Sequence, residues 1–254
     1  MEIVLSTDQW GESVDQAGAF ELLDRFVEAG GSHIETSVAT PSTGRPEDFA
    51  GATRMLKKWL RRRSDASLNV YCTIGFLDNH VSPLRKISSS SILTETELVR
   101  GRTFDQLCGI FVDCGDEASD EDWAECLKAM RYLRTTGLQV GLNSPPNENF
   151  ITKMNQEAGL PWTVGLTLNE NTQENIARLR RLLPQSRVIL EFENSPDPVL
   201  ADLSSDAQKS VFGIKIAAVT VSELEAFIAN APAIGAVGTK TTPSEAMQLS
   251  NQAS

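Results

Sequence analysis

The chain has 254 residues, 41% of them hydrophobic, and a formal net charge of −11 at pH 7, which fits one α/β barrel of roughly 250 residues. The negative charge disfavours nucleic acid and anionic membranes as partners, and no apolar run approaches the roughly 18 residues that a membrane-spanning helix needs. Without an N-terminal signal pattern either, we expect a single domain over residues 1–254, in the cytoplasm.

Short apolar or β-branched runs alternate with segments of helical periodicity, a pattern typical of parallel βα units. Strands are expected at about 2–7, 33–38, 68–74, 108–113, 138–143, 162–168 and 187–192, with the last barrel strand at about 233–238. Helices are expected at 17–29, 49–62, 120–135, 174–183 and 222–229. Residues 211–218 are a ninth strand candidate for eight places. They either pack irregularly before the final helix, or are the true seventh or eighth strand, in which case another assignment is wrong.

Two segments near the N-terminus carry a family resemblance. Residues 5–11, Leu-Ser-Thr-Asp-Gln-Trp-Gly, resemble the opening strand of the aldo-keto reductases, L-G-T-x-x-[FW]-G. Residues 26–37 are similar to the family's F-x-x-A-G-G-x-x-x-D-T-A, with Glu35 at the aspartate position. The resemblance implies an α/β fold of the (β/α)8 TIM-barrel type, aldo-keto-reductase-like, with shortened loops.

The catalytic tetrad that the resemblance implies is largely replaced in this chain. Thr40 stands at the position of the proton-donating tyrosine, Ile74 at that of the lysine and Asp113 at that of the histidine. A threonine hydroxyl is far too weak an acid to replace a tyrosine whose pKa is lowered by a nearby lysine. Because carbonyl reduction needs a general acid as the hydride arrives, these replacements disfavour ordinary reductase chemistry.

Residues at the family's cofactor-binding positions are better preserved. Asn143 and Ser144 resemble, in exchanged order, the pair that holds the nicotinamide carboxamide, and Phe192 resembles the aromatic side chain on which nicotinamide stacks. A strand end that leads into a helix N-terminus suits an anion, and the stretch similar to the family's adenosine-phosphate site comprises Gly238, Thr239 and Lys240. Core packing of Phe192 and plain loop geometry at residues 238–240 are the alternatives.

Four residues near strand ends are candidates for the chemistry, since the site of a parallel barrel lies at the carboxyl ends of its strands: Glu35, Asp113, Cys114 and Lys215. Glu35 and Asp113, on strands two apart, are expected to face each other as an acid and a base, unless either one caps the backbone or pairs with an arginine. Lys215 either lies desolvated inside the barrel, as Schiff-base lysines do, or extends its ammonium to solvent. Cys114 is either a nucleophile or an inert buried thiol.

Three functions are open at this point. Loss of the tetrad favours either a non-catalytic barrel or a repurposed enzyme that binds a small polar metabolite at the C-terminal mouth of the barrel and transfers no hydride. A diverged NADPH-dependent oxidoreductase would take its acid from the substrate or from Glu35. A non-catalytic barrel would serve as a subunit or regulator of a protein partner, or as a homo-oligomer. We expect no metal, and NADPH binding that is weak or absent.

Overall fold

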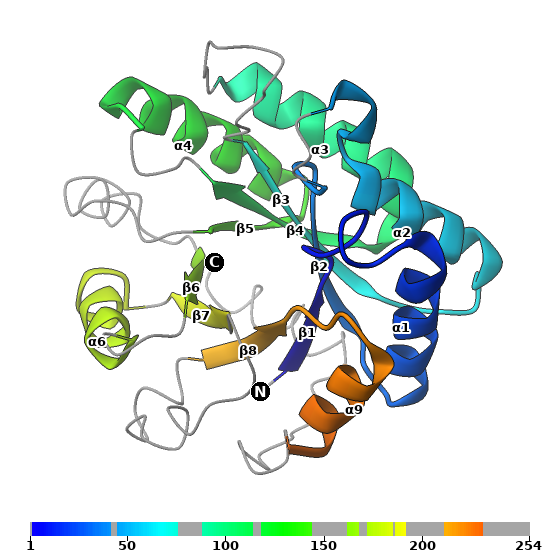
Figure 1. Ribbon diagram of the computed structural model, residues 1–254. Helices are drawn as coiled ribbons and strands as arrows, with labels where there is room; N and C mark the ends of the chain where they lie inside the picture. Colours follow the sequence, from blue (N-terminus) through cyan, green and yellow to red (C-terminus); the bar gives the residue numbers. More distant parts are fainter. Residues whose placement is uncertain are drawn as a thin grey trace.

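The computed structural model describes residues 2–41, 45–75, 88–113, 118–143, 162–167, 172–184, 186–191 and 211–230. Within these ranges, eight parallel strands form a closed barrel in chain order, β8 pairing with β1 (Figure 1). The strands are β1 (Glu2–Ser6), β2 (His33–Ser37), β3 (Asn69–Gly75), β4 (Leu107–Asp113), β5 (Gln139–Leu142), β6 (Trp162–Thr167), β7 (Arg187–Glu191) and β8 (Val211–Ile216).

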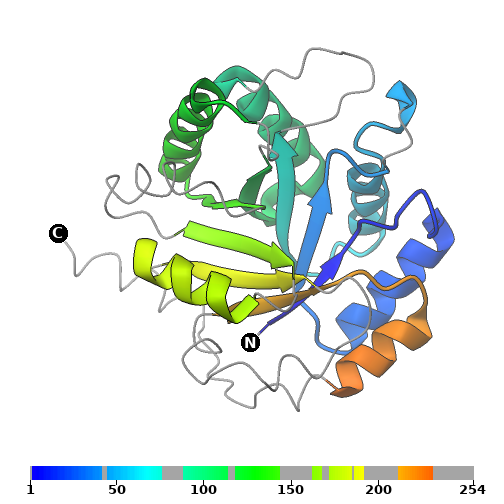
Figure 2. The same cartoon turned by 60° about the vertical axis from the view of Figure 1, so that its left-hand side comes forward.

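Helices lie on the outside of the strands (Figures 1 and 2). The described helices are α1 (Gln16–Glu28), α2 (Gly51–Arg62), α3 (Ser89–Thr103), α4 (Asp120–Thr135), α6 (Thr172–Leu182) and α9 (Val221–Asn230), with short 3-10 helices η1 (Pro46–Asp48) and η2 (Phe104–Gln106). Helices α1 and α9 pack against each other, next to the seam between β1 and β8. None of the described helices is long and apolar enough to cross a membrane.

Local signals in the sequence account for the helix ends. The side chain of Asp15 accepts a hydrogen bond from the amide of Gly18 at the start of α1. Ser119 and Asp122 form a reciprocal capping box at the start of α4, where the acidic first turn complements the positive end of the helix dipole. Gly137 follows α4 with a φ of +86°, a conformation that favours glycine.

Buried apolar side chains form two layers, one between the strands and the helices and one inside the barrel, because successive side chains of a strand point to opposite faces. The larger layer packs strands against helices and includes Ile214 and Ile216 of β8. A smaller cluster contains Tyr71, Phe111 and Ile189. Each of these three lies two residues before a polar residue at the carboxyl end of the same strand, so the cluster forms an apolar floor beneath a polar mouth.

The predicted (β/α)8 barrel is confirmed, and so are the first seven predicted strands, to within a residue or two at their ends. The assignment of the last barrel strand to residues 233–238 is wrong, because β8 at Val211–Ile216 pairs with both β7 and β1 and fills the eighth place. Residues 231–254 lie outside the described residues. Residues 211–218, the ninth strand candidate, therefore contain the true eighth strand.

Candidate functional site

A buried lysine at the carboxyl end of β8 forms the centre of the candidate site. Lys215 is 5% exposed, and its neighbours Ile214 and Ile216 point outward into the helix-facing layer. Strand alternation therefore turns the Lys215 side chain into the barrel. The desolvated alternative for this lysine is thus the one that the structure adopts, and the solvent-exposed alternative is wrong.

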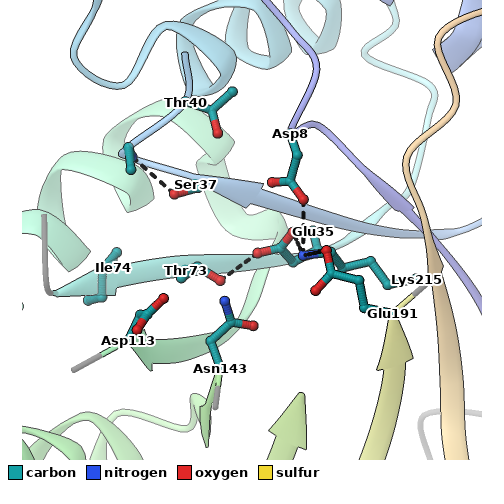
Figure 3. Close-up of a pocket in the computed structure, with 11 residues that line it drawn as sticks. Asp8, Glu35, Ser37, Thr40, Thr73, Ile74, Asp113, Asn143, Glu191 and Lys215 are labelled. Atoms are coloured by element: carbon teal, nitrogen blue, oxygen red, sulfur yellow. Dashed lines mark hydrogen bonds and ion pairs between the residues drawn. The ribbon is translucent and has the colours of Figure 1, made fainter. Parts of the chain in front are cut away.

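Three carboxylates surround the Lys215 ammonium (Figure 3). Its Nζ lies 3.1 Å from Asp8 Oδ2, 3.2 Å from Glu35 Oε2 and 3.0 Å from Glu191 Oε1. Glu191 is the register partner of Lys215 on the adjacent strand β7. Glu35 comes from β2, two strands away across β1, and strands two apart contribute to the same interior layer. Closure of the barrel between β8 and β1 is what brings these four side chains together.

Glu35 is the most buried acid of this cluster, 4% exposed. Its carboxylate accepts hydrogen bonds from the hydroxyls of Thr73 on β3 and of Ser6, its register partner on β1. Burial raises the pKa of Glu35 most strongly, the Lys215 ammonium lowers it, and the charges of Asp8 and Glu191 raise it again. The resulting pKa is about 7, so Glu35 exchanges its proton near neutral pH.

The ammonium of Lys215 stays charged. Burial alone would lower its pKa, but the charges of Glu35, Asp8 and Glu191 together outweigh burial and raise it above the ordinary value. A Schiff base requires a neutral amine as nucleophile, so this environment disfavours the role that a buried lysine first suggested. Lys215 is instead a fixed positive charge.

The cluster forms one wall of a cavity of about 300 Å³ at the mouth of the barrel. Four carboxylates line it: Asp8, Glu35, Asp113 and Glu191. Thr73 lies between the Lys215 cluster and the opposite wall, which carries Asp113, Ile74 and Asn143 (Figure 3). Below the cluster, Phe111 and Ile189 of the apolar floor line a smaller space beside Glu35 and Lys215.

A glycine on β6 makes room for the side chain of Asn143. A Cβ atom on Gly165 would lie 2.9 Å from Asn143 Oδ1, closer than ordinary van der Waals contact. Without that Cβ, the Asn143 amide lies at the end of β5 and lines both the cavity and the space beneath it.

The structure brings some of the predicted residues together and not others. Glu35, Asp113 and Lys215 share the cavity, but the ion-pair partner of Glu35 is Lys215, and an acid–base pair of Glu35 with Asp113 stays a prediction. Thr40 and Ile74, which the sequence resemblance places at the family's tyrosine and lysine positions, also line the cavity. The candidates outside the described residues are Cys114, Ser144, Phe192, Gly238, Thr239 and Lys240.

Sequence reasoning did not single out Asp8, which contacts Lys215 directly. Asp8 follows the first strand by two residues, so the rule that sites lie at strand ends could have found it. Thr73 was also missed as a hydrogen-bond donor to Glu35. Both lie inside segments that were interpreted only through their resemblance to a family motif.

No protein-family model matches the sequence, and no curated protein matches it either. Several solved structures are similar to this chain in fold. Aldo-keto reductase AKR11C1 from Bacillus halodurans, in its holo form, superposes with a TM-score of 0.68 at 14% identity over 98% of this chain and 91% of that one. A predicted aldo-keto reductase from Pseudomonas aeruginosa gives 0.67 at 19% identity, over 91% and 90%. The chain has the aldo-keto reductase fold. The resemblance noted in the sequence is thereby confirmed at the level of the fold.

The aldo-keto reductase fold raises the question of a nicotinamide cofactor, and the described residues do not supply a dinucleotide site. Asn143 offers one amide to the cavity. The single cationic group of the described lining, Lys215, is already held by three carboxylates. It is therefore not available to pair with the phosphate groups of a dinucleotide. The described residues likewise contain no group of three or more His, Cys, Asp or Glu arranged to hold a metal ion.

Proposed function

We propose that this protein is a repurposed aldo-keto-reductase-like enzyme that moves protons on a small polar metabolite at the mouth of the barrel, without hydride transfer. The observation that carries the proposal is Glu35: a buried carboxyl with a pKa of about 7 that lines a cavity beside a fixed ammonium. A catalytic acid or base works best when its pKa lies near the working pH, and burial against apolar residues is a known way to place it there.

Each residue of the cluster has a distinct part in the proposal. Ionised Glu35 accepts a proton from a C–H or O–H group of the bound molecule and returns it at another atom, so the proton count balances. The positive charge of Lys215 lowers the free energy of the ionised form of Glu35. Thr73 fixes the direction of the Glu35 carboxyl through its hydroxyl, and it lines the cavity itself.

A diverged oxidoreductase is the second candidate, and the same residue favours it. A protonated Glu35 could supply the acid that Thr40 cannot, since both line the cavity. The acidic lining disfavours this candidate. The cation of its described residues, Lys215, is already held by three carboxylates and so does not pair with the phosphates of a dinucleotide. The third possibility is a non-catalytic subunit. Such a protein would not need an acid with a raised pKa in the lining of its cavity.

Proton exchange provides a test that works before the substrate is identified. The purified protein is incubated in D2O with a panel of small polar metabolites, and ¹H NMR follows both consumption and loss of C–H signals. We expect at least one compound to react or exchange, with the rate reduced about 10²- to 10⁴-fold in Glu35→Gln. Glu21→Gln, at an exposed position of α1, is the matched control and should keep the full rate.

Two results would overturn the proposal. One is a Glu35→Gln protein that reacts as fast as the wild type. The other is a wild-type protein that alters no compound of the panel, which would favour the non-catalytic subunit. A ¹³C titration of the glutamate side chains gives an independent check, because one carboxyl should titrate near pH 7 and disappear from the spectrum of Glu35→Gln.

A further inference from the structure

The two oxygens of the Glu35 carboxyl have different neighbours. Oε2 lies 3.2 Å from the ammonium of Lys215 and accepts from the hydroxyl of Ser6 at 3.5 Å. Oε1 accepts a hydrogen bond from the hydroxyl of Thr73, and among the described residues no other side chain is hydrogen-bonded to Oε1. One side of the carboxyl therefore faces a positive charge, and the other side contacts a neutral hydroxyl.

This difference decides which oxygen carries the proton of neutral Glu35. An ammonium has three N–H donors and no acceptor, so a proton on Oε2 would face a group that repels it. The Ser6 hydroxyl is a poor acceptor for that proton, because its oxygen already accepts from the amide of Asp8 and lies 3.5 Å from Oε2, beyond the usual range of an O–H···O bond. The proton of neutral Glu35 therefore belongs on Oε1, where the oxygen of Thr73 accepts it.

The Thr73 hydroxyl consequently reverses its direction with the charge of Glu35. When Glu35 is ionised, Thr73 donates its proton to Oε1, and the lone pairs of Thr73 remain for another donor. When Glu35 is neutral, Thr73 accepts from Oε1, and its own proton turns away from Glu35. A hydroxyl rotates readily between these two roles. Thr73 is thus an acceptor for a further group in one state and a donor to it in the other.

The position of Thr73 in the barrel turns this reversal toward the cavity. In the register of β2 and β3, Glu35 pairs with Tyr71 and Ser37 pairs with Thr73. Thr73 therefore lies two residues closer to the carboxyl ends of the strands than the level of Glu35. Thr73 is 7% exposed and lines the cavity, on the side of Glu35 that faces the opposite wall (Figure 3). A molecule in the cavity meets the Thr73 oxygen on its way to Oε1.

We propose that Thr73 is a catalytic residue that relays protons between Glu35 and the bound molecule. An O–H or N–H bond of the molecule breaks as its proton passes to Thr73 Oγ1, and the original Thr73 proton passes to Glu35 Oε1. The electron pair of the broken bond stays on the molecule, and the reverse transfer restores both residues. This inference rests on the proposed function, because it takes Glu35 as the acid and base.

The rate at which Glu35 exchanges its proton tests the relay before a substrate is known. The full-length protein is labelled with ¹³C at the side-chain carboxyl of glutamate, and relaxation dispersion gives the rate constant for protonation of Glu35 at the pH midpoint of each variant. We expect this rate constant to fall at least tenfold in Thr73→Val, which keeps the shape and loses the hydroxyl. Thr73→Ser, which keeps the hydroxyl, should stay within threefold of the wild type.

Thr96→Val is the matched control. Thr96 is fully buried in α3, and its hydroxyl donates to the carbonyl of Ile92 in the same helix at 2.8 Å. The same substitution therefore removes a buried hydroxyl outside the cavity lining, and the protonation rate constant of Glu35 should equal that of the wild type. The midpoint of Glu35 should move up only in Thr73→Val, because the hydrogen bond from Thr73 lowers the pKa of Glu35.

The outcomes separate this inference from the proposed function. An unchanged rate constant in Thr73→Val would overturn the relay, and Glu35 would remain the candidate acid and base through direct contact with the cavity. Equal slowing in Thr73→Val and Thr73→Ser, or in Thr96→Val, would also overturn it, because the Thr73 hydroxyl would not be the cause. Slowing in Thr73→Val with recovery in Thr73→Ser would support the relay even if no metabolite of the panel reacts. A metabolite that reacts as fast with Thr73→Val as with the wild type would overturn it.

Discussion

Replacing Lys215 with methionine tests the electrostatic core of the site. Methionine has a similar length and fills much of the same space, so the packing loss is small. The main loss is that of the ammonium 3.0–3.2 Å from three carboxylates. Removing one partner of a buried ion pair commonly costs 3–5 kcal/mol, because the remaining charge is left without compensation. Asp8 and Glu191 are partly solvated, so Glu35 accounts for most of the cost and the lower end of that range applies.

The pH dependence makes this prediction specific. In the wild type, the ammonium of Lys215 lowers the pKa of Glu35. Without Lys215, the pKa of Glu35 therefore rises above its wild-type value of about 7. At pH 6 the Glu35 carboxyl is then neutral in both proteins and needs no cation. We expect a loss of about 3 kcal/mol in the free energy of unfolding at pH 9 and about 1 kcal/mol at pH 6. At pH 9 the midpoint of thermal unfolding should fall by about 6–12 °C.

Urea unfolding at the two pH values provides the measurement, with Lys128→Met as the matched control. Lys128 is exposed and pairs with Glu125 at 3.7 Å within α4, so its loss should cost less than about 1 kcal/mol at either pH. The double variant Lys215→Met/Glu35→Gln should regain most of the stability lost at pH 9. An equal loss at both pH values, or no recovery in the double variant, would refute the assignment of Glu35 as the group that needs the cation.

Three further predictions concern the ionisation of Glu35, the placement of Asn143 and the binding of NADPH. The pKa of Glu35 is raised from 4.5 to about 7 in the folded state, so the fold is most stable when Glu35 is neutral. The free energy of unfolding of the wild type, relative to that of Glu35→Gln, should therefore fall by about 3 kcal/mol between pH 4 and pH 8. A difference that does not change with pH in urea unfolding would contradict this. Gly165→Ala should displace the Asn143 amide and slow the reaction found with the metabolite panel at least fivefold, whereas Gly101→Ala, which meets no atom within 4 Å, should leave that rate unchanged. Titration by nicotinamide fluorescence should show no micromolar affinity for NADPH; micromolar binding that is lost in Lys240→Ala would instead favour the oxidoreductase.

Most of the fold was predictable because its signals are local. Alternating apolar runs and helical periodicity mark seven strands and the helices α1, α2, α4, α6 and α9 independently of tertiary contacts, whereas α3 was not among the predicted helices. The eighth strand was misplaced because local patterns give nine strand candidates, residues 211–218 among them, and do not say which eight close the barrel. Lys215 is compatible with the barrel interior because carboxylates from β2, from β7 and from the segment after β1 surround it, and no local pattern contains them.

The location of the site was predictable from the sequence, but the ion pairs between its side chains were less so. The strand-end rule selected Glu35, Asp113 and Lys215, and all three line the cavity. It could not say which acid would meet the lysine, because that depends on how β8 closes against β1 and on register shifts such as the one between β7 and β8. The pKa of Glu35 depends in turn on burial over the apolar floor, a tertiary property.

The position of Lys215 bears on how missing catalytic residues are interpreted in barrels. The sequence places Ile74 on β3 where the family resemblance implies a lysine, and the natural conclusion is that the site has no cation. In a closed barrel, however, side chains at the carboxyl ends of different strands converge on one mouth, so the strand that supplies a charge can change while the charge stays in the site. Lys215 enters from β8, and its Nζ lies 3.2 Å from the carboxylate of Glu35, which the sequence resemblance places at the family's aspartate position. A Lys215→Met/Ile74→Lys protein that regains the pH 9 stability lost in Lys215→Met would show that the two strands are interchangeable sources of this charge; one as unstable as the single variant would show that the contacts of Lys215 with Asp8 and Glu191 are specific to β8.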